Sequence, residues 1–224
     1  MKKVYALYTG HGLMEPLSRI FGEELPDARL VNVIDDSIIR DVRDSGGVTP
    51  AIASRIIRYY EIGASSGADL ILNTCSSVGD VADQAGFFVS VPIVRIDRAM
   101  AQQAVGIGSA IGVVATLPTT LEPTIRLVEC EAAAAGIDAS IVPVLADGAY
   151  DALVSGSPAD HDRLIREAAE EVADRVAVFV LAQGSMARME EALAAATGKP
   201  VLSSIRLGLQ SVAERLARPV ASGS

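Results

Sequence analysis

The chain has 224 residues, half of them hydrophobic, and a formal net charge of −9 at pH 7. This acidic balance argues against a surface that binds nucleic acid or an anionic membrane, because both need clustered Lys and Arg. The apolar runs are shorter than the roughly 20 residues that span a bilayer, and MKKVYALYTGHG at the start has too short an apolar part for a signal peptide, so we expect a cytoplasmic protein.

Short apolar or β-branched runs alternate along the chain with longer segments whose apolar residues recur at three- and four-residue spacing. The short runs predict strands over residues 3–9, 28–34, 69–74, 91–96, 110–116, 138–144, 176–182 and 199–204. The longer segments predict helices over residues 15–25, 49–67, 78–87, 122–136, 159–175 and 187–198. This β-α-β alternation predicts an α/β fold with mostly parallel sheets.

The second half of the chain repeats features of the first. VYALYTGHGLMEPLSRIF lies over IGVVATLPTTLEPTIRLV, pairing Thr9 with Thr116 and Glu15 with Glu122 at one offset. Chance matches are the alternative, but their order and nearly constant offset favour a duplication. We therefore expect two similar flavodoxin-like half-domains, formed by residues 1–97 with 207–224 and by residues 98–206. They would be related by a pseudo-twofold axis, with the active site in the cleft between them.

Cys75 follows the predicted strand 69–74 directly, in the stretch LNTCSS. In parallel sheets ligands bind at the carboxyl ends of the strands, and a following helix offers unpaired N–H groups. At such a position the pKa of a thiol is expected to be lowered, and the neighbouring Ser76 and Ser77 can donate hydrogen bonds to an anion. A small buried hydrophobe is the other interpretation of a free cysteine, but the polar neighbours favour a functional thiol.

The turn of the second half that corresponds to LNTCSS is LAQGSM, in which Gly184 stands where the first half has Cys75. Gln183 and Ser185 flank it. No histidine adjacent in sequence activates Ser185, so we assign this residue to binding rather than to nucleophilic catalysis.

The two repeated halves, the turn Asn73-Thr74-Cys75, the VATLPT stretch and LAQGSM together resemble the aspartate/glutamate racemase superfamily. This superfamily includes hydantoin and glutamate racemases, maleate isomerase and arylmalonate decarboxylase. The resemblance implies an enzyme without metal or organic cofactor that transfers a proton at the carbon next to a carboxylate. It also implies a homodimer or a higher homo-oligomer.

Racemases of this superfamily use two cysteines on opposite faces of the substrate, whereas arylmalonate decarboxylase keeps one. The chain departs from the two-cysteine pattern because Gly184 replaces the second thiol. Its remaining thiol, Cys75, lies in the opposite half from the cysteine of the decarboxylase. Neither activity is therefore carried over directly.

Cys75 is the predicted catalytic acid/base. The predicted substrate-binding residues all follow strands, and they are Thr9, His11, Asn73, Thr74, Ser76, Ser77, Thr116, Thr119, Thr120, Gln183, Gly184 and Ser185. Thr119 is equally well interpreted as the N-cap of a helix that begins at Leu121, and His11 as a surface histidine without a role. Two cysteines and two histidines do not form a metal-site pattern, and Cys130 lies in a helical pattern that suggests packing.

Three functions are open at this level. The first is a racemase-like enzyme acting on a small carboxylate. The second is an arylmalonate-type decarboxylase or a maleate-type cis-trans isomerase that uses the single thiol, and the third is a non-catalytic protein that binds a small carboxylate. A flavodoxin-like nucleotide or signalling module is disfavoured, because GHG at residues 10–12 is not a dinucleotide-binding fingerprint.

Overall fold

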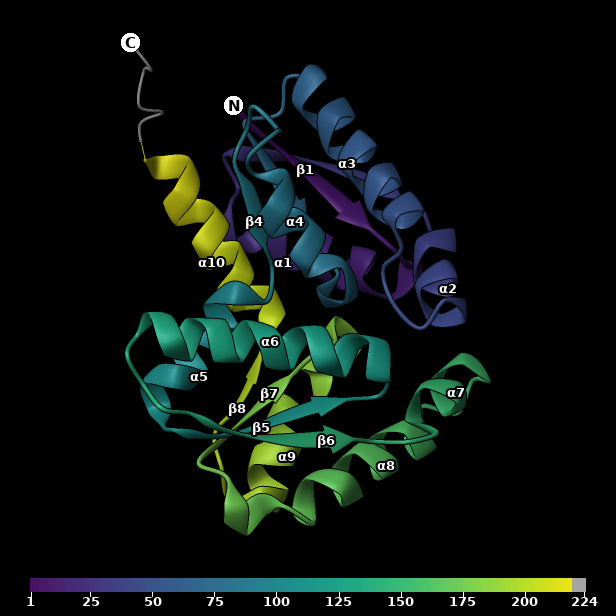
Figure 1. The fold of residues 1–224 in the computed structure, drawn as a ribbon, viewed down its shortest axis with the longest axis vertical. Helices are drawn as coiled ribbons and strands as arrows, with labels where there is room; N and C mark the ends of the chain where they lie inside the picture. Colours follow the sequence, from purple (N-terminus) through teal and green to yellow (C-terminus); the bar gives the residue numbers. More distant parts are fainter. Residues whose placement is uncertain (219–224) are drawn as a thin grey trace. The chain divides into compact units, whose positions relative to one another are not determined.

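The computed structural model describes residues 1–218 and contains two four-stranded sheets in which all neighbouring strands run parallel (Figure 1). The chain divides into two compact units. Unit 1 comprises Met1–Ile96 and the segment that begins at Ile205, and unit 2 comprises Asp97–Ser204. The predicted α/β class with two parallel-sheet units is confirmed.

Unit 1 has the strand order β2-β1-β3-β4. The strands are β1 (Lys2–Tyr8), β2 (Ala28–Ile34), β3 (Leu70–Asn73) and β4 (Ile93–Arg95). The helices are α1 (Met14–Glu24), α2 (Ser37–Asp44), α3 (Pro50–Ser65), α4 (Gly79–Ala85) and α10 (Ser204–Ala217), with 3₁₀ helices η1 (His11–Leu13) and η2 (Ser76–Val78). Helices α2, α3 and α4 pack their apolar sides with Tyr5, Leu7 and Ile71 of the sheet into one core cluster.

Unit 2 has the equivalent strand order β6-β5-β7-β8. Its strands are β5 (Ala110–Ala115), β6 (Ser140–Leu145), β7 (Val178–Leu181) and β8 (Val201–Ser203). Its helices are α5 (Arg98–Ile107), α6 (Pro118–Ala134), α7 (Ala149–Val154), α8 (Pro158–Glu170) and α9 (Glu190–Thr197), with 3₁₀ helices η3 (Ala173–Arg175) and η4 (Gly184–Met189). In Figure 1, α6 lies along one face of this sheet and α8 and α9 along the other.

All eight predicted strands are present, and each predicted helical segment contains a helix. Helices α2, α5, α7 and α10 were not among the predicted segments. Helices α2 and α7 are shorter than the windows of 11 or more residues in which helical periodicity is recognised. Helices α5 and α10 follow their strands after at most two residues, so no turn signal marks where they begin.

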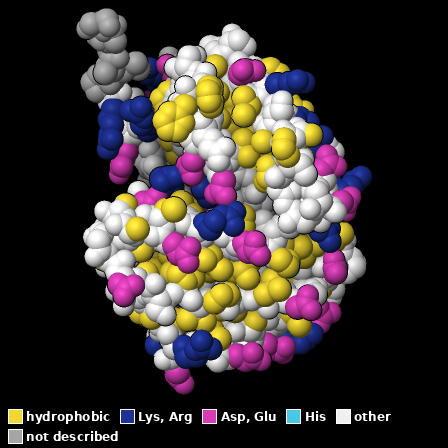
Figure 2. All heavy atoms as spheres, in the orientation of Figure 1, with side chains coloured by type: hydrophobic (Ala, Val, Ile, Leu, Met, Phe, Trp, Pro, Cys, Tyr) yellow, Lys and Arg dark blue, Asp and Glu magenta, His cyan; other side chains and the backbone are white. Residues whose placement is uncertain are grey.

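Charged side chains of both signs are intermixed on the face of the molecule shown in Figure 2. On α8, Arg163 and Glu167 pair one helical turn apart, with 2.9 Å between Nη1 and Oε2. Within residues 1–218 no helix is both long and apolar enough to cross a membrane.

Gly208 on α10 is packed against the end of β4. A Cβ added there would lie 2.5 Å from the carbonyl oxygen of Ile96, whereas a Cβ added at Gly106 on α5 would meet nothing within 4 Å. Gly208→Ala should therefore lower the free energy of unfolding by about 1–3 kcal/mol through overpacking. Gly106→Ala should raise it by about 0.4–1 kcal/mol, because alanine loses less backbone entropy than glycine on folding.

Thermal unfolding followed by calorimetry tests this pair, with the midpoint expected to fall for Gly208→Ala and to rise for Gly106→Ala. An unchanged midpoint for Gly208→Ala would contradict the close packing of α10 on the β4 end.

Candidate active site

The register of β1 and β3 brings the turns of Thr9 and Cys75 together in unit 1. Leu7 pairs with Asn73, and the ladder continues because the Thr74 N–H donates to the Leu7 carbonyl at 3.3 Å. Thr9 and Cys75 each stand two residues beyond this last pair. As a result, the Thr9 hydroxyl hydrogen-bonds to the Cys75 sulfur.

Further donors reach the same sulfur from the residues that follow Cys75. They are the hydroxyl and N–H of Ser77 and the N–H of Val78. Cys75 is the N-cap of η2 and has an extended backbone, with φ −122° and ψ 117°. The chain therefore turns immediately after Cys75 and directs the unpaired N–H groups of the first helical turn toward its side chain.

Burial raises the pKa of the Cys75 thiol above its ordinary value, although the donors from Thr9, Ser77 and Val78 favour the thiolate. The predicted lowering of this pKa is therefore wrong. Desolvation of the partly buried residue outweighs the donors, and the helix after it is one 3₁₀ turn followed by only seven α-helical residues. The thiol consequently keeps its proton at neutral pH.

Asn73 and Thr74 use their side chains to hold the turn. Asn73 Nδ2 donates to the Cys75 carbonyl at 3.0 Å and Asn73 Oδ1 accepts from the Tyr60 hydroxyl at 3.1 Å. The Thr74 hydroxyl donates to the Leu7 carbonyl at 2.8 Å. Both residues are buried. They therefore fix the backbone around Cys75, although the sequence predicted that they contact substrate.

Tyr60 was missed by the sequence analysis. It lies on the buried side of α3, and burial, followed by the proximity of Cys75, raises the pKa of its hydroxyl. In the sequence Tyr60 is recognisable only as part of the apolar stripe that also contains Ile52 and Ile56. Such a stripe predicts that a residue is buried, and it does not predict a hydrogen bond near Cys75. The polar contact to Asn73 depends on the packing of α3 on β3.

Arg95 was also missed. It ends β4 with its side chain only 2% exposed, and its Nη1 lies 2.7 Å from Asp83 and 3.5 Å from Asp80 on α4. A Cβ at Gly79 would come within 2.3 Å of the guanidinium, so a larger residue where α4 begins would displace the Arg95 side chain. Arg95 thus anchors α4, and with it the segment that follows Cys75.

The remaining predicted residues of unit 1 differ in exposure. Ser76 and Ser77 are buried in the turn, at 6% and 4% exposure. His11 lies in η1 with an exposed side chain, and its Nε2 is 3.2 Å from Asp36 Oδ2. It is not among the groups that bond to the Cys75 sulfur.

In unit 2 the register of β5 and β7 gives an equivalent pair of turns. Val114 pairs with Leu181, and two residues beyond this pair stand Thr116 and Gln183. The N–H and the hydroxyl of Thr116 both donate to Gln183 Oε1, at 2.7 and 3.0 Å. Gln183 therefore links the two turns, and Gly184 and Ser185 after it begin η4 as partly buried residues. Gln183, like Cys75, is the extended N-cap two residues beyond the last strand pair, so the predicted match of Cys75 with Gly184 is wrong by one residue.

Thr119 does not cap a helix. Helix α6 begins at Pro118, with Leu117 as its N-cap and no side-chain capping bond. The predicted start at Leu121 is wrong because Pro118, whose fixed φ suits the first helical position, starts the helix earlier. Among residues 1–218, the Thr119 hydroxyl oxygen is one of the buried side-chain atoms without a hydrogen-bond partner, while Thr120 is buried beside it in sequence.

No cluster of three or more His, Cys, Asp or Glu residues in the described chain is arranged to hold a metal ion. Cys130 lies exposed on α6. The prediction that the turns of the two units face one cleft concerns the placement of the units, and it stays a prediction.

Comparison with known proteins gives consistent results. The family model described as Asp/Glu/Hydantoin racemase matches residues 9–212. None of the curated proteins matches the sequence.

Several solved structures share the fold. Allantoin racemase from Klebsiella pneumoniae has a TM-score of 0.73 and 17% identity, covering 97% of this chain and 88% of that one. Glutamate racemase from Francisella tularensis in complex with D-glutamate has a TM-score of 0.76 and 12% identity, with 96% and 81% covered. Unliganded arylmalonate decarboxylase has a TM-score of 0.58 and 12% identity, with 98% and 94% covered.

The raised pKa of Cys75 predicts that its thiolate forms at a higher pH than the thiolate of an ordinary exposed cysteine. Thr9→Val should move the midpoint still higher, because it removes a donor that favours the thiolate. The measurement is thiolate absorbance against pH in the Cys130→Ser variant, with the protein lacking both cysteines as the blank. A midpoint at or below the ordinary value would mean that the donors outweigh desolvation.

Proposed function

Because the chain belongs to the Asp/Glu/hydantoin racemase family, we propose that it is an isomerase that transfers a proton at the carbon next to the carboxylate of a small substrate, an amino acid or a related compound. The reaction uses side chains alone, without metal or organic cofactor. The observation that carries this proposal is the Cys75 thiol at the carboxyl end of β3, with hydroxyl and N–H donors gathered on its sulfur.

Cys75 is the acid/base in this proposal. In its thiolate form Cys75 removes the proton from the carbon next to the carboxylate, and in its thiol form, which burial favours, it delivers a proton to the carbanion-like carbon. After delivery the sulfur is negative, and the bonds from Thr9, Ser77 and Val78 then stabilise it. The same donors therefore reduce the free-energy difference between the thiol and the thiolate of Cys75, both of which form during the proposed reaction.

Removing a proton next to a carboxylate places negative charge on the carboxylate oxygens, which need hydrogen-bond donors that are already in position. We assign Thr119 to this role because its buried hydroxyl has no protein partner within the described chain. Ser76 is a further hydroxyl donor at the thiol turn, whereas the Ser77 hydroxyl already bonds to the Cys75 sulfur. Asn73, Thr74, Tyr60 and Gln183 hold the turns, since their polar side-chain atoms bond to the protein.

A single-thiol reaction is the second candidate, and Gln183 at the unit 2 position equivalent to Cys75 is the observation that favours it. Gln183 stands where a second thiol would complete a two-base racemase, and its side-chain amide is not a proton-transferring group at neutral pH. A decarboxylase needs only one group to protonate the intermediate that remains after loss of CO₂. A cis-trans isomerase needs one thiolate to add to the double bond and leave again.

Incubation in D₂O with amino acids, hydantoins, malonates and maleate separates these reactions, with NMR reporting deuterium on carbon. Cys75→Ala should lower the rate of carbon-bound deuterium uptake at least about 100-fold, the size of a general acid–base contribution. Cys130→Ala, which changes the exposed cysteine on α6, should leave the rate unchanged.

The product identifies the reaction. Inverted configuration supports the racemase, loss of CO₂ supports the decarboxylase, and fumarate from maleate supports the cis-trans isomerase. Full deuterium uptake by Cys75→Ala would refute the assigned role of the thiol. Absence of any reaction across the panel, together with saturable binding of one carboxylate, would favour a binding protein instead.

Thr119→Val should reduce kcat/KM about 100-fold or more, the effect of losing one donor to a developing oxyanion. The free energy of unfolding should stay within about 0.5 kcal/mol of the wild-type value, because the hydroxyl has no partner to lose.

Thr124→Val is the matched control on the same helix, since the buried Thr124 hydroxyl donates to the Thr120 carbonyl at 2.9 Å. It should lower stability by about 1 kcal/mol and leave kcat/KM unchanged. Unaltered kinetics in Thr119→Val would remove this residue from the substrate site.

A further inference from the structure

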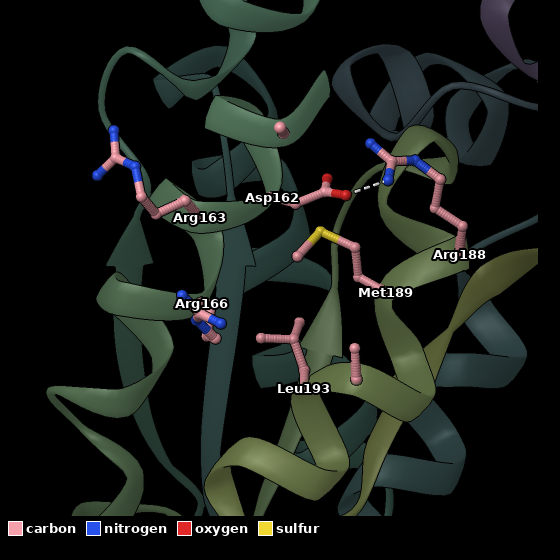
Figure 3. Close-up of a pocket in the computed structure, with 8 residues that line it drawn as sticks. Asp162, Arg163, Arg166, Arg188, Met189 and Leu193 are labelled. Atoms are coloured by element: carbon pink, nitrogen blue, oxygen red, sulfur yellow. Dashed lines mark hydrogen bonds and ion pairs between the residues drawn. The ribbon is translucent and has the colours of Figure 1, made fainter. Parts of the chain in front are cut away.

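Unit 2 contains a pocket of about 230 Å³ between α8 and the segment formed by η4 and α9 (Figure 3). Three arginines line it: Arg163 and Arg166 from α8, and Arg188 from η4. Its lining also includes Asp162 and the apolar side chains of Met189 and Leu193. No role in the proposed reaction involves these residues.

The three guanidinium groups are not equally engaged by neighbouring carboxylates. Arg163 donates to both carboxylate oxygens of Glu167, at 3.1 and 2.9 Å, and also contacts Asp160. Arg166 is 4.0 Å from the nearest oxygen of Glu170, which is beyond hydrogen-bond range. Arg166 is therefore the cation of the pocket that is most available to a ligand.

Arg188 reaches across the pocket toward α8. Its guanidinium pairs with Asp162, and the dashed line in Figure 3 marks this contact. The side chain of Arg188 is still 45% exposed. Its Nη2 also lies 3.3 Å from His161 Nδ1. A guanidinium has five N–H donors, so it can keep both of these partners and bind an anion as well.

The rest of the pocket is apolar. Met189 and Leu193 are 5% and 1% exposed, and both project between α8 and α9 in Figure 3. The volume is below the roughly 300–1,000 Å³ typical of sites for drug-sized ligands. Cationic rim groups over a small apolar floor suit a compact organic anion better than an inorganic ion.

We propose that this pocket binds a small organic anion, with a carboxylate or phosphate group on Arg166 and Arg188 and an apolar part against Met189 and Leu193. The anion shares the Arg188 guanidinium with Asp162 and so changes the contact between α8 and η4. Because η4 begins with Gly184 and Ser185, binding alters the position of that turn. The pocket thereby acts as an effector site within unit 2.

The test uses full-length protein labelled with ¹³C in the methionine methyl groups and titrated separately with benzoate, phenyl phosphate and inorganic phosphate. The Met189 resonance should shift and saturate with benzoate, phenyl phosphate or both, and the one that binds identifies the charged group. Met186, which lies in η4 close to Gly184, should shift over the same concentration range. Met100, fully buried on α5, serves as the reference signal.

Arg166→Gln and Arg188→Gln should each weaken binding about tenfold or more, as expected for a lost charge-assisted hydrogen bond. Arg163→Gln is the matched control and should change the affinity about twofold at most, because Glu167 already engages that guanidinium. The Met189 shift should persist in Cys75→Ala, which separates this pocket from the candidate active site. An unchanged Met100 signal verifies folding of each variant.

Three results would overturn the proposal. The first is the absence of a saturable Met189 shift up to about 20 mM of any probe, a concentration at which a site with a millimolar Kd would be largely occupied. The second is equal affinity for inorganic and phenyl phosphate, because the apolar floor would then contribute nothing. The third is a Met189 shift without a Met186 shift, which would leave no effect of binding on η4.

Discussion

Parallel pairing of the central strands is the constraint on which both candidate turns depend. Each unit places two strands side by side in the same direction, β1 with β3 and β5 with β7, so their carboxyl ends lie at one edge of the sheet. The register then determines which residues meet beyond the strands. In unit 1 it joins Thr9 to Cys75, and in unit 2 it joins Thr116 to Gln183. A shift of one residue in either pairing would separate these side chains.

Within this common scaffold the two units have different chemistry. The turn of unit 1 places several hydrogen-bond donors around a thiol. The Tyr60–Asn73 and Arg95–Asp83 contacts fix the segments on either side of this turn. The turn of unit 2 has Gln183 in place of the thiol, and this side chain bonds to the N–H and hydroxyl of Thr116. The strand order is thus the same in both units, while only the turn of unit 1 contains a cysteine.

Burial and hydrogen bonding act in opposite directions on Cys75. An exposed thiol with the same donors would tend to ionise, and a buried thiol without them would stay protonated under all ordinary conditions. The combination suits a group that must hold a proton, release it and recover it in one catalytic cycle. The arginine pocket of unit 2 shows that local and net charge can differ in sign. Three arginines line this pocket, although the net charge of the chain is −9. Net charge therefore says little about which small anions a local site attracts.

The sequence by itself determined the α/β class, the positions of all eight strands, the duplication and the turn that carries Cys75, because these depend on local periodicity and on the residues that end a strand. It did not determine the direction in which the pKa of Cys75 shifts, since desolvation depends on how much of the chain packs around the sulfur. Nor did it identify Tyr60, Arg95 or the unpaired hydroxyl of Thr119. These roles arise from contacts between segments distant in the sequence, or from the point at which Pro118 starts its helix, and only the tertiary structure decided them.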